Sequence, residues 1–421
     1  MQQYLRIPGR QKTRGSIKIN GAKNAAVAII PASLLTGSVV KLDNLPDITD
    51  IHRLIEILTV LGAKISVTSE TSMDLDLSGI NSSVPPPGLV NQLRASYYLM
   101  GSLLGRFRKV DIPLPGGCHL GPRPIDQHVK GFSALGATVE FDNDFVKLRA
   151  DKLVGAHIYF DVVSVGATVN TMLAAVLAEG KTVLENAAKE PEIVDIANFL
   201  NAMGASVRGA GTDVIKIEGV KELYGAEHIV IPDRIEAGTF MLAAAVTGGE
   251  VLIKDIIPKH LDSIIAKLKE VGVELEIGLD WVLVKGSDNL QPSDVKTFPY
   301  PGFPTDLQPQ MMVLLARAKG TSQITENVFE KRFQHVHELR KMGARIKLEG
   351  RSAIIEGGYN LTGARLQAED LRGGASFIIA ALASEGVTEI RGVEHIDRGY
   401  EKIEERFATL GVHIDRITGD Q

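Results

Sequence analysis

Residues 58–67 read LTVLGAKISV, in which the end of an amphipathic run is followed by a glycine and an alternating apolar stretch. The same signature returns as SALGATVEF (133–141), NAMGASV (201–207), KEVGVELEI (269–277), RKMGARIKL (340–348) and ATLGVHI (408–414). The six glycines, at positions 62, 136, 204, 272, 343 and 411, are separated by 68 to 74 residues. A period this regular predicts six related units of about 70 residues that fill the chain.

Each unit is expected to contain a helix and then a strand. In the first unit the apolar residues before the glycine follow helical spacing, namely Ile51, Leu54, Ile55, Leu58 and Leu61. The glycine comes where a helix end favours a residue that tolerates positive φ. The stretches after the glycines alternate apolar and polar side chains and are rich in β-branched residues, as half-buried strands are.

A second kind of helix is apolar on nearly every face, which is typical of a helix inside a core. It is predicted from AKNAAVAIIPASLL (22–35), VGATVNTMLAAVLA (165–178), AGTFMLAAAV (237–246) and GASFIIAALA (374–383). Three such units per domain predict layered α/β packing. We expect two similar domains, residues 22–230 and residues 1–21 with 231–421, in which the strand-like SIKIN (16–20) pairs with the second half.

Composition narrows the classes of function. The chain of 421 residues has 46 basic and 51 acidic residues, a net charge of −5, which argues against a dedicated nucleic-acid binder. No apolar run reaches the roughly 18 residues that span a bilayer, and no secretory signal is recognisable. We therefore expect a cytoplasmic protein whose partners are small molecules and not nucleic acid or membranes.

The only cysteine, Cys118, lies in PLPGGCHLGPRP (113–124), where seven of twelve residues are proline or glycine. Such a loop is neither helix nor strand. His119 and Arg123 stand near enough in sequence to lower the pKa of the thiol, which predicts a reactive cysteine; the alternative is an incidental thiol in a turn. A single cysteine forms no internal disulfide and makes a structural metal site improbable, so no metal or cofactor is expected.

Charged residues also stand at or near the starts of the expected helices: Lys23, Arg94, Asp233, Arg234, Asp306, Asp370 and Arg372. A helix N-terminus with a cationic side chain beside it is a natural anion site. For the aspartates the alternative is a simple helix cap. Recurrence in several units predicts that the cations converge on a substrate with several negative charges, the candidates being Lys23, Arg94, Arg123, Arg332, Arg372 and Arg398.

Ten motifs, in order, carry a resemblance that covers the whole chain: NGAKNAA (20–26), LRASYYLMG (93–101), LPGGCHLGPRPIDQH (114–128), SVGAT (164–168), EPEIVD (190–195), IPDRIEAGTF (231–240), FPTDLQPQ (303–310), VFEKRFQH (328–335), DLRGGAS (370–376) and HIDRGYEKIE (395–404). With them the sequence resembles the UDP-N-acetylglucosamine branch of the enolpyruvyl transferase family. The resemblance implies two domains of three repeats each, in an inside-out α/β barrel. It also implies transfer of the enolpyruvyl group of phosphoenolpyruvate to the 3′-hydroxyl of UDP-N-acetylglucosamine with release of phosphate, the first committed step of peptidoglycan synthesis.

Roles are implied by the same resemblance. Cys118 matches the general acid, the residue through which fosfomycin inhibits the family, and Asp306 matches the carboxylate that faces the sugar hydroxyl; the other matched catalytic residues are Lys23 and Arg398. The residues matched to phosphoenolpyruvate are Lys23, Asn24, Arg123, Arg332, Arg372 and Arg398. The residues matched to UDP-N-acetylglucosamine are Arg94, Arg123, Pro124, Ile125, Asp126, Gln127, Ser164, Val165, Gly166, Asp306 and Val328.

The chain departs from the family at a few nucleotide positions. Many members have a lysine where Val162 and Val163 stand here, some have one at Thr49, and Gln127 replaces an apolar residue. Two alternatives remain open: a sister transferase that acts on shikimate 3-phosphate, and a non-catalytic nucleotide-sugar sensor. The GGC loop argues against the first, and the complete set of acid, base and arginines argues against the second.

Overall fold

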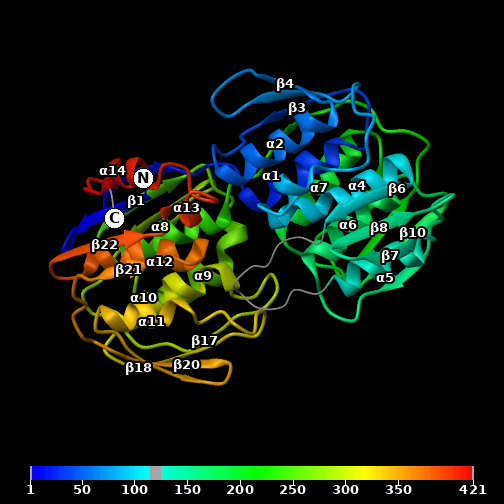
Figure 1. The fold of residues 1–421 in the computed structure, drawn as a ribbon. Coiled ribbons are helices and arrows are strands. Elements are labelled where there is room, and N and C mark those ends of the chain that lie inside the picture. The colour runs from blue at the N-terminus through cyan, green and yellow to red at the C-terminus, as the bar shows by residue number, and fades with distance from the viewer. Residues whose placement is uncertain (1, 114–124, 420–421) are drawn as a thin grey trace. The chain divides into compact units, whose positions relative to one another are not determined.

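A computed structural model describes residues 2–113 and 125–419. These residues form two compact units (Figure 1). Unit 1 comprises residues 2–20 and 232–419, and unit 2 comprises residues 21–113 and 125–231. Each unit has its own cluster of buried apolar side chains. The loop with Cys118, Arg123 and Pro124 lies outside the described residues.

The core of unit 2 is formed by helices that are apolar on nearly every face: α1 (Lys23–Ser33), α4 (Tyr98–Phe107) and α6 (Val165–Ala175). Helix α4 packs against both α1 and α6. Nearly every side chain of α6 is buried, as its sequence predicts. The remaining helices of the unit are α2 (Thr49–Leu61), α3 (Pro87–Val90), the 3₁₀ turn η1 (Arg94–Tyr97), α5 (Asp126–Ala134) and α7 (Pro191–Ala202).

The strands of unit 2 form three sheets in its described part. The first has the order β13 (Glu227–Ile229), β3 (Val39–Asp43), β5 (Met73–Asp76), β4 (Lys64–Val67). The second has the order β6 (Lys109–Pro113), β8 (Phe145–Arg149), β7 (Thr138–Asp142). The third has the order β11 (Ser206–Arg208), β12 (Val214–Glu218), β10 (Lys181–Glu185), β9 (His157–Tyr159).

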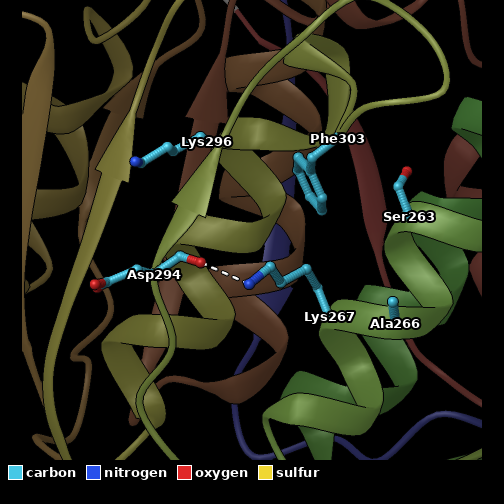
Figure 2. A pocket seen from close by; sticks show the side chains of 6 residues that line it. All are labelled: Ser263, Ala266, Lys267, Asp294, Lys296 and Phe303. Atoms are coloured by element: carbon cyan, nitrogen blue, oxygen red, sulfur yellow. Dashed lines mark hydrogen bonds between the residues drawn. The ribbon is translucent and has the colours of Figure 1, made fainter.

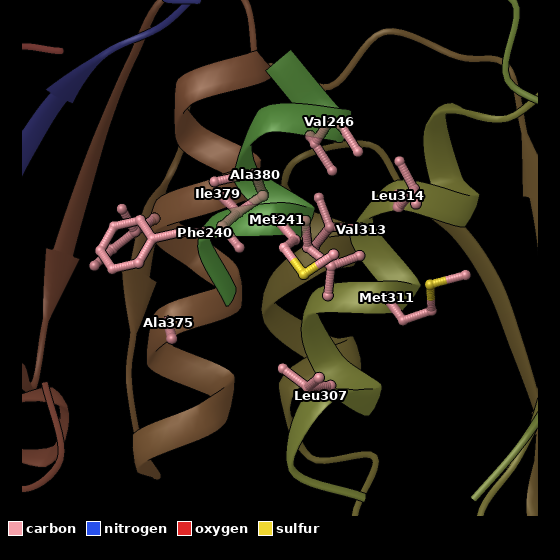
Figure 3. Packing of buried hydrophobic residues seen from close by; sticks show 14 of the residues in the cluster. Phe240, Met241, Val246, Leu307, Met311, Val313, Leu314, Ala375, Ile379 and Ala380 are labelled. Atoms are coloured by element: carbon pink, nitrogen blue, oxygen red, sulfur yellow. The ribbon is translucent and has the colours of Figure 1, made fainter. Parts of the chain in front are cut away.

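Unit 1 repeats this plan with α8 (Arg234–Thr247), α10 (Gln308–Arg317) and α12 (Leu371–Ala383), which all contact one another. Figure 3 shows how Met241 of α8, Val313 of α10 and Ile379 of α12 point into the shared apolar core. The remaining helices are η2 (Pro258–Leu261), α9 (Asp262–Glu270), η3 (Thr305–Leu307), α11 (His335–Lys341), α13 (Val393–Ile396) and α14 (Ile403–Ala408).

Three four-stranded sheets complete the described part of unit 1. The first has the order β15 (Glu274–Ile277), β16 (Trp281–Lys285), β14 (Glu250–Lys254), β2 (Arg14–Lys18). The second has the order β17 (Val295–Lys296), β18 (Gly320–Thr325), β20 (Ser352–Gly357), β19 (Arg345–Glu349). The third has the order β21 (Arg365–Gln367), β22 (Val387–Arg391), β1 (Gln2–Pro8), β23 (Asp415–Gly419).

The N-terminal segment belongs to unit 1, and the expectation that SIKIN pairs with the second half is confirmed. Strand β2 runs parallel to β14, with Ile17 opposite Ile253. Strand β1, which the periodic pattern does not predict, lies between β22 and β23 and is antiparallel to both. The first and last strands of the chain are therefore neighbours (Figure 1).

The prediction for the signature glycines is also confirmed. All six have positive φ, from 72° at Gly411 to 113° at Gly62. Gly62 is the C-cap of α2, and a Cβ there would overlap the carbonyl oxygen of Gly79. Both the backbone angle and the close approach therefore require glycine at this position.

The mixed α/β layering is as expected. Within residues 2–113 and 125–419 the sheets are separate and have three or four strands each, so no sheet closes on itself to form a barrel. In the same part of the chain, no helix is long and apolar enough to cross a bilayer.

Candidate functional site

The predicted site residues that the structure describes are divided between the two units. Unit 1 carries Asp306, Val328, Arg332, Arg372 and Arg398, and unit 2 carries Lys23, Asn24, Arg94, Ile125, Asp126, Gln127, Ser164, Val165 and Gly166.

In unit 1 one carboxylate lies between two buried guanidinium groups. Asp306 Oδ1 accepts a hydrogen bond from Arg332 Nη2 at 3.1 Å, and Asp306 Oδ2 accepts one from Arg372 Nε at 3.3 Å. The two arginines are only 3% and 4% exposed. Two cations therefore share one carboxylate, and Asp233 also acts on Arg372, in a place where water screens charge weakly.

Both guanidinium groups keep unused donors. Arg332 Nε and Arg372 Nη1 are buried and have no hydrogen-bond partner among the described residues. Leaving a charged donor buried and unpaired is costly, so such donors call for an acceptor. An anionic ligand is the simplest acceptor for two buried, charged donors.

Arg372 is held charged by its surroundings. Burial lowers its pKa, but Tyr400, Asp306 and Asp233 raise it by more, so the pKa lies above its ordinary value. The guanidinium lies over the ring of Tyr400, 5.3 Å from its centroid. The Tyr400 hydroxyl in turn contacts the hydroxyl of Thr239 at 2.8 Å. A buried network of side chains from α12, α8 and the turn before α14 thus orients this arginine.

Two of the aspartates at helix starts, Asp233 and Asp370, are helix caps. Asp233 accepts from the N–H groups of Ile235 and Glu236, and it is the N-cap of α8. Asp370 accepts from the N–H groups of Arg372 and Gly373, and it is the N-cap of α12. For these two the cap interpretation is confirmed.

Asp306 behaves differently. It lies within η3, and the N-cap position of α10 is Leu307, which has no side-chain cap. Its carboxylate is turned to the two arginines and is partly exposed. The interpretation that Asp306 caps α10 is therefore wrong.

The other predicted residues of unit 1 are Val328 and Arg398. Val328 is 37% exposed, and its N–H donates to Glu326 Oε1. Arg398 is half-buried in the turn that follows α13. His335, at the start of α11, is buried; burial lowers its pKa to about 4, and Asp370 and Arg332 act on it in opposite directions.

In unit 2, Lys23 is the first residue of α1 and is almost completely buried. Its Nζ pairs with Asp50 Oδ2 of α2 at 2.8 Å. Asn24, the next residue, is half-buried. The ion pair fixes the lysine at the N-terminal end of a core helix, where the helix dipole favours anions.

The predicted nucleotide residues of unit 2 are partly brought together. Ser164 caps α6 by accepting from the Ala167 N–H at 3.2 Å. A Cβ at Gly166 would touch Tyr97 and His128, so this glycine is required for close packing. Burial, followed by Arg94, lowers the pKa of His128 to about 4.

Gln127 is tied to the segment before the SVGAT motif. Its Nε2 donates to Asp161 Oδ2 at 3.1 Å, and its Oε1 accepts from the Asp161 N–H at 3.0 Å. Asp126 is exposed and accepts from Gln127, and Ile125 is half-buried. The departure at Gln127 therefore has a structural role that an apolar side chain would not fill.

Sequence reasoning missed Asp50, Tyr97, His128 and Tyr400. Asp50 lies in the first turn of α2, where an aspartate is indistinguishable from a helix cap in the sequence. His128 has no hydrogen bond to either ring nitrogen among the described residues. The sequence around His128 does not reveal this, because the burial of a polar residue on a helix depends on helices elsewhere in the chain.

A cavity of about 380 Å³ opens on unit 1 beside α9 (Figure 2). It is lined by Ser263, Ala266, Lys267, Asp294, Lys296 and Phe303. Lys267 Nζ donates to the Asp294 carbonyl at 2.7 Å and is thereby held at the wall. None of the predicted site residues lines this cavity. Within the described residues no group of three or more His, Cys, Asp or Glu side chains could hold a metal ion.

Comparison with known proteins identifies the family of the chain. The EPSP synthase (3-phosphoshikimate 1-carboxyvinyltransferase) family model matches residues 7–407. A UDP-N-acetylglucosamine 1-carboxyvinyltransferase 3 from Caldanaerobacter subterraneus is 56% identical, covering 99% of this chain and 100% of the relative. A UDP-N-acetylglucosamine 1-carboxyvinyltransferase 2 from Bacillus subtilis is 55% identical, covering 99% and 98%.

Solved structures give the same result for the fold. The enolpyruvyl transferase NikO from Streptomyces tendae superposes with a TM-score of 0.91 at 25% identity, covering 100% of both chains. EPSP synthase from Acinetobacter baumannii superposes with a TM-score of 0.75 at 21% identity, covering 99% of this chain and 100% of that one. The chain belongs to the enolpyruvyl transferase family and is a transferase.

Proposed function

We propose that this protein transfers the enolpyruvyl group of phosphoenolpyruvate to the 3′-hydroxyl of UDP-N-acetylglucosamine and releases phosphate. The observation that carries the proposal is the cluster of Asp306, Arg332 and Arg372, which combines a partly exposed carboxylate with two buried cations that have unused donors. The relatives at 53 to 56% identity support UDP-N-acetylglucosamine as the acceptor. This reaction commits its product to peptidoglycan synthesis.

The chemistry needs one base and one acid. In the addition step Asp306 takes the proton of the sugar hydroxyl, the oxygen bonds to C2 of phosphoenolpyruvate, and Cys118 protonates C3. In the elimination step the Cys118 thiolate takes a proton back from C3, the double bond re-forms, and the C2–O bond breaks as phosphate leaves with the proton that Asp306 had taken. Atoms and charge balance without a metal or redox cofactor.

Charge stabilisation falls to the cations. The tetrahedral intermediate carries a phosphate and a carboxylate, and the unused donors of Arg332 and Arg372 suit such a group. We assign Lys23, Asn24, Arg123 and Arg398 to the same anion by resemblance. Preorganised donors in a site with little water stabilise a transition state better than mobile solvent does.

The nucleotide is assigned to the residues of unit 2. Arg94 and the segments 123–127 and 164–166 are proposed to hold the uridine diphosphate, and Asp306 and Val328 to face the sugar. Ser164 and Gly166 begin α6, and free N–H groups at a helix start favour a diphosphate. The valines at 162 and 163 leave this segment without a lysine, so less of the binding energy is expected from charge here.

We further propose that units 1 and 2 are the two domains of three repeats each, arranged as inside-out α/β barrels. An apolar helix and a positive-φ glycine recur six times, and five of the six sheets in the described residues contain a parallel strand pair; this recurrence supports six repeats. We place the protein in the cytoplasm, where both proposed substrates are available.

A phosphate-release assay tests the function. Purified protein and phosphoenolpyruvate are incubated with UDP-N-acetylglucosamine in one arm and with shikimate 3-phosphate in another. Phosphate release with the nucleotide sugar alone is expected. Release with shikimate 3-phosphate would support the sister reaction, and nucleotide binding without release would support a sensor.

A further inference from the structure

We propose that Glu326 and Thr305 are positioning residues that set the place of Asp306. This inference rests on the proposed function, in which Asp306 removes the proton of the acceptor hydroxyl. Neither residue is among those that the family resemblance matches to a substrate.

Glu326 is a buried carboxylate that joins three segments of unit 1. It follows β18 and is only 2% exposed. Its Oε1 accepts from the Thr297 hydroxyl at 2.8 Å, from the Val328 N–H at 2.8 Å and from the Phe329 N–H at 3.1 Å. Its Oε2 accepts from the Thr305 hydroxyl at 2.9 Å.

The four donors to the Glu326 carboxylate are neutral hydroxyl and N–H groups, while Arg351 Nε donates to the main-chain carbonyl of Glu326 at 2.9 Å. Taking a carboxylate out of water is costly unless it is paired or hydrogen-bonded, so four donors are needed to keep it there. A buried carboxylate with four such hydrogen bonds holds them in a narrow geometry, because any movement leaves part of its charge unsatisfied. Glu326 therefore acts as a rigid joint between the segments.

Two of the joined segments carry the site. Thr305 directly precedes Asp306 in η3, so its hydroxyl fixes the turn from which the Asp306 carboxylate projects. On the other side, Phe329 lies under the guanidinium of Arg332, with the ring centroid 5.6 Å away. The hydrogen bonds of Glu326 therefore connect the turn that carries Asp306, the proposed base, with the segment that carries Arg332.

The cation pair alone does not fix Asp306. Arg332 and Arg372 each donate a hydrogen bond to one of its two oxygens. These hydrogen bonds change when an anionic substrate accepts from the same guanidinium groups. The Thr305 to Glu326 hydrogen bond lies on the backbone side of Asp306 and is independent of the substrate. It keeps the base in place during the step in which the charge around it changes, where a displacement of about 1 Å can cost about 100-fold in rate.

Thr305→Val tests the inference because valine keeps the shape of threonine and removes only the hydroxyl. We expect kcat to fall about 10- to 100-fold, while KM for both substrates stays within about twofold, since the proton transfer and not the binding is disturbed. Thr305→Ser keeps the donor and should restore most of kcat. The assay is phosphate release, with circular dichroism melting to follow stability.

Thr13→Val is the matched control. Thr13 is fully buried in the same unit, and its hydroxyl pairs with that of Thr247 at 3.0 Å. The substitution removes a buried threonine hydroxyl without touching η3, so it should lower the melting temperature by a similar amount and leave kcat within about twofold. An equal loss of kcat in Thr305→Val and Thr13→Val would overturn the inference, because only stability would then be at work.

Glu326→Gln supplies the second arm. The amide keeps the size of the side chain but replaces one accepting oxygen with a donor, so kcat should fall again with KM little changed. Thr305→Val and Glu326→Gln both weaken the same hydrogen bond, between Thr305 and Glu326. The fall in kcat of the variant with both substitutions should therefore be smaller than the product of the two single falls. Independent losses, or full kcat in Thr305→Val of an active enzyme, would contradict the positioning role. An inactive wild type in the same assay would instead overturn the proposed function, and the inference with it.

Discussion

At the residue scale, Asp306 is set apart from the other aspartates by its partners. Asp233 and Asp370 accept hydrogen bonds from backbone N–H groups at the starts of helices, whereas Asp306 accepts from two arginine side chains. A cap stabilises the local backbone, while a carboxylate held by cations at a partly exposed position is available to a ligand. The same residue type thus has two functions in one chain.

Asp306→Asn should lower kcat about 100- to 10,000-fold, because the amide keeps the shape and loses the base. Binding of UDP-N-acetylglucosamine should stay measurable by isothermal titration calorimetry. Asp370→Asn is the control for stability, since asparagine caps a helix as well as aspartate does. Near-normal turnover of the Asp306 variant would remove this residue from the mechanism.

At the element scale, a single buried carboxylate ties the N-terminal segment to α8. Glu236 Oε2 accepts from the Asn20 N–H at 2.8 Å, and its Oε1 accepts from Arg406 Nη2 at 2.9 Å. Burial raises the pKa of Glu236 to about 7, against the lowering effect of Arg406. The folded protein therefore holds a proton here at pH values where the unfolded chain has lost it.

The pH dependence of stability follows from this shift. Between the ordinary value of 4.5 and about 7, the folded state binds more protons than the unfolded state, so stability falls as pH rises. Relative to Glu236→Gln, the wild type should lose about 2 to 3 kcal/mol of unfolding free energy between pH 5 and pH 8. Urea unfolding at each pH measures this.

Glu250→Gln, on the exposed side of β14, reports the general effect of losing one carboxylate. The quantity compared is the difference in unfolding free energy between the wild type and each variant. If this difference changed no more with pH for Glu236→Gln than for Glu250→Gln, Glu236 would not be the group responsible.

The helix ends are a second feature at the element scale. Gly62→Ala should destabilise the protein by about 1 to 3 kcal/mol, because alanine is strained at positive φ and its Cβ would overlap Gly79. Gly88 in α3 has open space around it and an ordinary φ, so Gly88→Ala should be neutral or slightly stabilising. Thermal melting of the two variants makes the comparison; equal melting temperatures would show that the signature glycine is not required.

At the scale of the whole molecule, the residues proposed to bind substrates are divided between two units with separate cores. Those proposed to hold the uridine diphosphate belong to unit 2, while Asp306 and the two buried arginines belong to unit 1. A ligand that contacts residues of both units should reduce the population of locally unfolded states in both.

Hydrogen exchange with mass spectrometry can follow each unit by itself. Saturating UDP-N-acetylglucosamine should slow exchange at 93–97 and 164–168 of unit 2 and at 304–308 and 326–332 of unit 1. UDP, which lacks the sugar, is the matched ligand and should protect only the segments of unit 2. Protection confined to unit 2 with the complete nucleotide sugar would contradict the assignment of Asp306 and Val328 to the sugar.

Much of the secondary structure could be predicted from the sequence because it depends on local sterics and periodicity. The helices that end near the six signature glycines, the strands that follow the first five and the apolar helices α1, α6, α8 and α12 agree with the prediction. After Gly411 the predicted stretch VHI (412–414) is not a strand, and β23 begins at Asp415. The family and the residue types of the site were also recognisable, since ten motifs retain their order along the chain.

The tertiary structure alone decided which residues meet. Strand β1 carries no repeat signature, yet it lies between β22 and β23, because the backbone hydrogen bonds that pair strands do not require the side-chain pattern of the repeat. Lys23 meets Asp50, and Asp306 meets Arg332 and Arg372, through the packing of helices and turns that are distant in sequence. Whether an aspartate caps a helix or holds a pair of arginines depends on what that packing brings within about 3 Å of its oxygens, and no local pattern contains this information.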